Sequence, residues 1–207
     1  LGAPGVGGCN ERLDASVAAF LEAVSAGTPT PGGGSVAALA GALAAALGIM
    51  ACRIGPPTGP DKPAHTATQL HATEQRLLSL RSKLQALIQS DADAYANVMN
   101  AYRMPKDDSS RAAAIVKHLE AATEVPLETA TLAAEAATVL RELLPLTKPS
   151  VASDLKVGLL MALAAIEGGL ENVKTNLKSI KKPDLINKYR AQLAAIEESL
   201  VQLRRVC

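Results

Sequence analysis

Aromatic residues are scarce in this 207-residue chain, which has three tyrosines, one phenylalanine and no tryptophan. Single-stranded nucleic-acid sites stack bases on aromatic side chains, so this scarcity weakens a nucleic-acid interpretation. A charge of one sign is lacking too, because 21 basic residues face 20 acidic ones without a long basic block. Such a balance gives no general attraction to nucleic acids or anionic lipids. We expect neither nucleic acid nor membrane among the partners.

Motifs for metals and nucleotides are also missing. His65, His71 and His118 form no pair at metal-ligand spacing and no cluster with cysteine, which argues against a zinc site. The glycine run at 32–34 lacks the Lys-Ser/Thr of a phosphate loop and follows no strand, unlike a dinucleotide fingerprint. We therefore expect no metal and no cofactor.

The three cysteines, Cys9, Cys52 and Cys207, are odd in number and far apart. This usage indicates reduced thiols and a cytoplasmic protein. The start of the chain lacks the charged and apolar regions of a signal peptide. We interpret residues 1–10 as a flexible N-terminal segment and residues 11–207 as one domain.

No stretch shows the period-two alternation of a surface strand, whereas apolar residues recur at helical spacing through most of the chain. We expect an all-α fold, a single-domain bundle of about six to seven helices with a long central helix. The expected helices span residues 13–24, 36–52, 66–102, 107 or 109 to 123, 126–144, 151 or 153 to 180, and 183–203. In this scheme Pro126 lies in the first turn of its helix, where a proline is tolerated.

The segment 36–52 carries no charge and is mostly alanine, glycine and leucine. The glycine turn before it leads to Ser35, whose hydroxyl we expect to cap the N-terminus of this helix. A membrane span is the rival interpretation. We reject it because the run stops short of about 20 residues and no second segment of this kind is evident.

One carboxylate interrupts the apolar stripe of the long helix. Continuing the spacing of Leu84 and Ile88 brings Asp91 to the inward face and leaves Asp93 on the wetter side. Burial tends to raise a carboxyl pKa toward values useful in general acid–base catalysis. The alternative is a structural aspartate bonded to a neighbouring helix end or tyrosine.

The helix after residue 151 carries three further candidates. Asp154 lies in its first turn, and Asn172 and Asn176 are one turn apart near its end. Asp154 and Asn172 are about 27 Å apart at 1.5 Å per residue, so they cannot touch one small group. Either the two residues contact different ends of a long ligand, or they act in different subunits, or one of them has a structural role. In the structural alternative, the amides satisfy neighbouring backbone groups.

Five motifs occur in order along the chain: Pro31-Gly32-Gly33-Gly34-Ser35-Val36-Ala37-Ala38, Asp91-Ala92-Asp93-Ala94-Tyr95, Val125-Pro126-Leu127, Ser153-Asp154, and Asn172-Val173 followed by Asn176. Together they resemble the cyclodeaminase domain of the formiminotransferase-cyclodeaminase family, whose relatives include a bacterial methenyltetrahydrofolate cyclohydrolase. The resemblance implies a helical homodimer that binds a tetrahydrofolate derivative without metal or redox cofactor. A formiminotransferase domain or protein is a further expected partner.

The resemblance implies formiminotetrahydrofolate cyclodeaminase activity, which closes 5-formiminotetrahydrofolate to 5,10-methenyltetrahydrofolate and releases ammonia. Two alternatives stay open: a methenyltetrahydrofolate cyclohydrolase, and a non-catalytic helical dimer that binds folate or a protein. The family's acid–base aspartate falls on Asp91, with Asp93 as the fallback. The resemblance assigns substrate contacts or supports to Gly32, Gly33, Gly34, Ser35, Asp154, Asn172 and Asn176.

Overall fold

The computed structural model describes residues 16–56 and 66–204, and within them the chain is helical without a strand. The α-helices are α1 (Val17–Ser25), α2 (Gly33–Ile54), α3 (Thr66–Arg103), α4 (Arg111–Leu143), α5 (Ala152–Leu177) and α6 (Pro183–Arg204). Two 3₁₀ turns, Leu144–Leu146 and Pro149–Val151, connect α4 to α5. The predicted all-α class is confirmed. The expected N-terminal segment 1–10 and the first residues of the helix expected over 13–24 lie outside the described residues.

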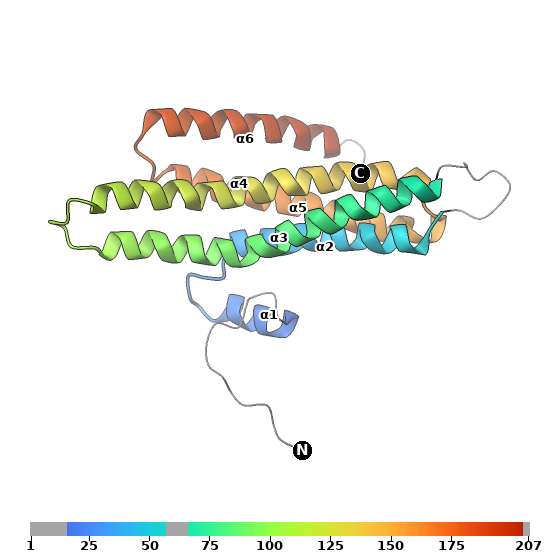
Figure 1. Ribbon diagram of the computed structural model, residues 1–207, viewed down its shortest axis with the longest axis horizontal. Coiled ribbons are helices and arrows are strands. Elements are labelled where there is room, and N and C mark those ends of the chain that lie inside the picture. Colours follow the sequence, from blue (N-terminus) through green and yellow to red (C-terminus); the bar gives the residue numbers. More distant parts are fainter. Residues whose placement is uncertain (1–15, 57–65, 205–207) are drawn as a thin grey trace, which may run out of the picture.

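Helices α2 to α5 run side by side as a bundle, with α6 along one side and α1 on the opposite side (Figure 1). Small residues bring α2 and α5 together. A Cβ added at Gly168 would lie 3.0 Å from the Cβ of Ala37, and one at Gly41 would lie 3.5 Å from the Cβ of Ala165. The contacting residue numbers increase along α2 while they decrease along α5, so the two helices are antiparallel. Glycine and alanine thus allow the backbones of α2 and α5 to approach each other closely.

The expectation of only one long apolar segment is wrong. Gly33–Ile54 and Pro149–Leu177 are both long and apolar enough to cross a membrane, with 67% and 44% of their apolar windows buried inside the protein. Such helices are weak evidence for a span, because a buried core helix meets the same criterion. The buried share of α2 reflects its place between α3, α4 and α5.

The predicted helix break at Pro126 is wrong, because α4 continues through it. A proline inside a helix removes the N–H that would bond the carbonyl four residues earlier. That carbonyl belongs to Ala122, and the side-chain amide of Asn176 donates to it at 2.7 Å. Helix α5 also packs closely here, since a Cβ at Gly169 would lie 2.7 Å from the Pro126 carbonyl oxygen. A donor from α5 thus replaces the missing main-chain hydrogen bond.

Cys52 is a buried free thiol in α2. Burial is the main cause that raises its pKa to about 11, with a smaller contribution from the nearby Glu74 carboxylate. A thiol with so little thiolate at neutral pH is a poor nucleophile. Cys9 and Cys207 lie outside the described residues.

Candidate active site

A cavity of about 270 Å³ lies where α2 begins. Figure 1 shows α3 and α4 extending beyond the start of α2. From Asp91 to Arg103, α3 continues for about 18 Å at 1.5 Å per residue. The cavity is lined by Pro29, Thr30, Gly32, Gly33, Gly34, Asp91, Tyr95, Val98, Tyr102, Leu119, Ala122, Asn172, Asn176 and Ser179. Six of the predicted site residues thus meet in one place.

The carboxylate of Asp91 is bound to the first turn of α2. The Ser35 hydroxyl lies 3.0 Å from Asp91 Oδ2 and 2.9 Å from the Ile88 carbonyl oxygen, and Ser35 is fully buried. The Ser35 main-chain N–H also donates to this carboxylate. The positive end of α2 adds a favourable field. Asp91 therefore occupies the position of an N-terminal capping group supplied from α3.

The expectation that Ser35 caps its own helix is wrong. The helix begins at Gly33, with Gly32 as the N-cap residue and no side-chain cap hydrogen bond. Ser35 lies in the first turn, where its hydroxyl points across to α3. Its partner is the carboxylate of Asp91 on α3, and the sequence around Ser35 does not predict that contact.

Gly34 makes room for the carboxylate. A Cβ added there would lie 2.6 Å from Asp91 Cγ and 2.8 Å from Oδ2, closer than a real Cβ approaches other atoms. The absence of a side chain at this position allows the carboxylate to rest against the backbone of α2. The glycine thus acts on the position of Asp91, besides lining the cavity.

Two opposed effects act on the pKa of Asp91. Burial raises the pKa above its usual value, and the hydrogen bonds from the Ser35 hydroxyl and N–H lower it to a smaller extent. The net shift is upward, in the direction that suits a group exchanging protons near neutral pH. Asp93 is exposed and accepts a hydrogen bond from Gln89 at 2.9 Å. The predicted inward and outward faces of these two aspartates are confirmed.

Asn172 and Asn176 line the cavity, and their side-chain amides donate hydrogen bonds to main-chain carbonyls. Asn172 donates to the Gly168 carbonyl at 2.8 Å, and Asn176 donates to Ala122. The structural alternative is confirmed for both N–H donors, and substrate contact by the same side chains stays a prediction. Asp154 lies in the first turn of α5 and is not among the lining residues. Its role as a folate contact also stays a prediction.

Two tyrosines belong to the site that were not predicted as site residues, although the helical spacing already places Tyr95 on the inward face with Asp91. Tyr95 and Tyr102 line the cavity and are 40% and 42% exposed. With Asp91 and Val98 they follow one another at intervals of four, three and four residues, which keeps all four on one face of a helix. Extending the stripe by one more turn would have found Tyr102.

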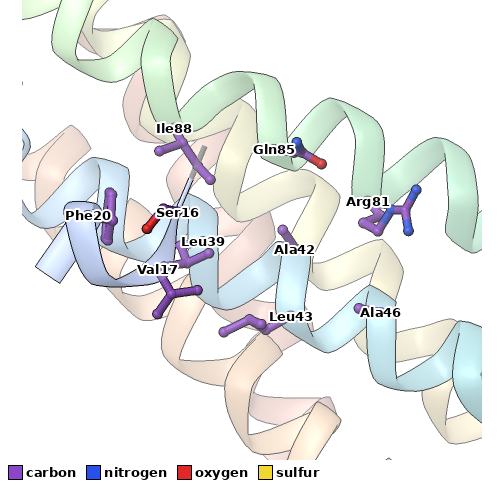
Figure 2. A pocket seen from close by; sticks show the side chains of 10 residues that line it. All are labelled: Ser16, Val17, Phe20, Leu39, Ala42, Leu43, Ala46, Arg81, Gln85 and Ile88. Atoms are coloured by element: carbon purple, nitrogen blue, oxygen red, sulfur yellow. The ribbon is translucent and has the colours of Figure 1, made fainter. Parts of the chain in front are cut away.

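A second cavity, of about 220 Å³, lies between α1, α2 and α3. Figure 2 shows Phe20 and Val17 of α1 facing Leu39 and Leu43 of α2 across it, with Arg81 at one end. Among the described residues, its lining includes no carboxylate and no histidine. Among the described cavities, the group suited to proton transfer is therefore Asp91 in the first one.

Known proteins resemble this chain along most of its length. The sequence profile of the formiminotransferase-cyclodeaminase family matches residues 16–195. A methenyltetrahydrofolate cyclohydrolase from Methylorubrum extorquens is 32% identical over 169 residues, which cover 80% of each chain. The formimidoyltransferase-cyclodeaminase of Rattus norvegicus is 33% identical over 193 residues, which cover 89% of this chain and 34% of the relative. This chain thus spans about a third of that relative's length.

A solved structure shares the fold. The crystal structure of formiminotetrahydrofolate cyclodeaminase from Thermotoga maritima superposes with a TM-score of 0.82 and 24% identity over 92% of both chains. The profile match covers far more than half of the residues, and the helical architecture agrees with it. This chain belongs to the formiminotransferase-cyclodeaminase family.

Proposed function

We propose that this chain is a formiminotetrahydrofolate cyclodeaminase in which Asp91 carries protons. The observation that carries the proposal is the carboxylate of Asp91, partly buried at a cavity wall, with a raised pKa and a fixed position against α2. The named activities of the relatives supply the substrate class, a one-carbon derivative of tetrahydrofolate.

The reaction needs one proton to move between two nitrogens. In the protonated formimino group, N10 attacks the formimino carbon and forms the second carbon–nitrogen bond of the ring. Asp91 takes the proton that N10 then carries and delivers it to the departing nitrogen, which leaves as ammonia. The bridging carbon becomes the methenyl cation, so the charge balances and Asp91 ends ionised as it began. A single carboxylate can perform both transfers.

Ser35 suits both protonation states of Asp91. When Asp91 is ionised, the Ser35 hydroxyl donates to Oδ2; when Asp91 is protonated, the hydroxyl can turn its hydrogen to the Ile88 carbonyl and accept from the carboxyl group. The two distances, 3.0 and 2.9 Å, permit either arrangement without movement of the heavy atoms. Neither state leaves a buried polar group without a partner.

Absorbance in the methenyltetrahydrofolate band tests the proposal. Purified protein added to 5-formiminotetrahydrofolate should raise the absorbance, and Asp91→Asn should lower kcat by about 10²–10⁴, the usual contribution of a positioned acid–base group. Asp93→Asn is the matched control, since Asp93 is exposed on the same helix, and it should keep the wild-type rate. Full activity in Asp91→Asn would contradict the assignment.

Methenyltetrahydrofolate cyclohydrolase is the second candidate, because the Methylorubrum extorquens relative matches 80% of both chains. In that reaction water adds to the methenyl carbon, a carboxylate takes the proton, and the ring opens to 10-formyltetrahydrofolate. The protein would then lower the absorbance of methenyltetrahydrofolate. Absence of both signals, with thermal stabilisation by folate, would favour the non-catalytic binder. Association with a formiminotransferase stays a prediction.

The proposal includes a homodimer. Large apolar side chains are exposed on α2 and α5, the two helices that pack together through small residues: Val36, Leu43, Val157 and Leu160. Apolar exposure on adjacent helices is typical of protein interfaces. Sedimentation should give twice the chain mass, and Leu160→Lys should give the monomer. Val201→Lys, at an exposed position of α6, should not change the mass; a monomeric wild type would contradict the dimer.

A further inference from the structure

A second hollow adjoins the active-site cavity at the end of the bundle. This hollow, about 330 Å³, lies between the end of α3, the start of α4 and the segment that joins α5 to α6. Its walls include Tyr102, Leu119 and Ser179, which also line the Asp91 cavity. The two spaces therefore share one boundary, and a long molecule can extend from one into the other.

The hollow is basic. Its charged lining residues are Arg111, Lys181 and Lys182, and no acidic residue lines it in the described part of the chain. Arg111 is committed to structure, because it donates to the main-chain carbonyls of Met104 and Tyr102, each at 3.1 Å. Its charge still lies at the wall of the hollow.

Lys181 and Lys182 differ from other lysines of this region. Both are exposed, and neither ammonium has a hydrogen bond or ion pair among the described residues. By contrast, Lys174 pairs with Glu197 at 3.0 Å and Lys188 pairs with Glu124 at 3.3 Å. The two unpaired ammonium groups are thus available to an anion in the hollow.

The path from the carboxylate to the lysines is long and carries aromatic rings. Asp91 and Tyr102 are about 16 Å apart along α3 at 1.5 Å per residue, and Tyr95 lies between them on the same face. Flat rings bind well on exposed tyrosines. The order along this path is a proton-transfer group, two aromatic side chains and a basic end.

A tetrahydrofolate can follow this path in the same direction. Its reacting nitrogens, N5 and N10, lie between the reduced pterin and a benzoyl ring, the benzoyl ring leads away from them, and one or more glutamate carboxylates end the molecule. We propose that the substrate binds with its reacting end at Asp91 and its glutamate carboxylates at Lys181 and Lys182, which set the preference for the length of the glutamate tail. This orientation rests on the proposed function for the identity of the ligand.

A double variant, Lys181→Gln with Lys182→Gln, tests the orientation. For a substrate with several glutamates its KM should rise about tenfold or more, the equivalent of losing one charge-assisted contact, while kcat stays near the wild-type value. The increase should be smaller for the monoglutamate. Lys178→Gln is the control, because Lys178 faces a different hollow three residues earlier, and its KM should not change.

A calorimetric titration with p-aminobenzoyl-triglutamate tests the same point without turnover. Wild type and Lys178→Gln should bind it, and the double variant should lose at least about tenfold in affinity. Equal affinity in all three proteins, or no binding to wild type, would overturn the orientation while leaving the folate reaction in place. If the wild-type protein turned over none of the folate substrates, the proposed function would be overturned instead, whatever the titration shows.

Discussion

Gly34→Ala should disable catalysis while sparing the fold. A methyl group at this position would lie 2.6 Å from Asp91 Cγ, whereas ordinary contact begins at 3.4 Å. The carboxylate must retreat by more than about 0.8 Å, the difference for Cγ, because Asp91 Oδ1 lies closer still to the added methyl group. A displacement of about 1 Å can cost about 10² in rate when the moved group takes part in the chemistry. We expect kcat to fall by about that factor.

Stability should change much less than activity. Alanine is better than glycine inside a helix by about 0.5–1 kcal/mol. The weakened Ser35 hydrogen bonds to Asp91 act in the opposite direction and lower the stability of the fold by about 1.5–3 kcal/mol, since the acceptor is charged. The net loss is about 1–2 kcal/mol, or a few degrees in Tm for a chain of this size. Thermal unfolding followed by circular dichroism checks this value.

The control comes from the neighbouring residue. A Cβ at Gly33 would lie 3.4 Å from Asn172 Nδ2, which is ordinary contact, so Gly33→Ala should cost far less in kcat than Gly34→Ala. In an Asp91→Asn background, Gly34→Ala should add little, because the glycine acts through that carboxylate. Wild-type kcat in Gly34→Ala would refute the argument that the position of Asp91 against α2 matters for the reaction.

Three further predictions follow from single contacts. Ser35→Ala removes a donor that lowers the pKa of Asp91; that pKa should rise further, and the acid limb of the kcat/KM profile should move to higher pH. Asn176→Ala should destabilise the fold by about 1–3 kcal/mol in denaturant unfolding, and less when Pro126→Ala restores the main-chain donor. Arg81→Met should be neutral or stabilising in the same assay, because Arg81 Nε is buried and has no hydrogen-bond partner among the described residues.

The helix content and the inward face of the long helix could be predicted from the sequence. Both depend on local periodicity, since apolar residues three and four apart share a face. The same rule predicted that Asp91 faces inward and Asp93 faces water, and it extends to Tyr95 and Tyr102. Periodicity was sufficient wherever one helix supplied all the residues in question.

The contacts between helices could not be predicted in this way. Ser35 and Asp91 are 56 residues apart, and a serine after a glycine run reads locally as a cap for its own helix. The glycine at 34 likewise reads as a turn former, although the structure uses it to admit a side chain from α3. Such roles depend on which helix lies opposite, and a pattern in one segment contains no information about that.

Pro126 and Asn176 show how two separate motifs can be one structural unit. Taken alone, the proline predicts the start of a helix and the asparagine predicts a ligand contact. In the structure the two act together: Pro126 leaves the Ala122 carbonyl without a main-chain donor, and the side-chain amide of Asn176 in α5 donates to that carbonyl instead. This bond keeps α4 continuous at the wall of the cavity, which Ala122 and Asn176 both line. Loss of Asn176 should therefore affect the active site through α4 even if its amide never contacts the substrate.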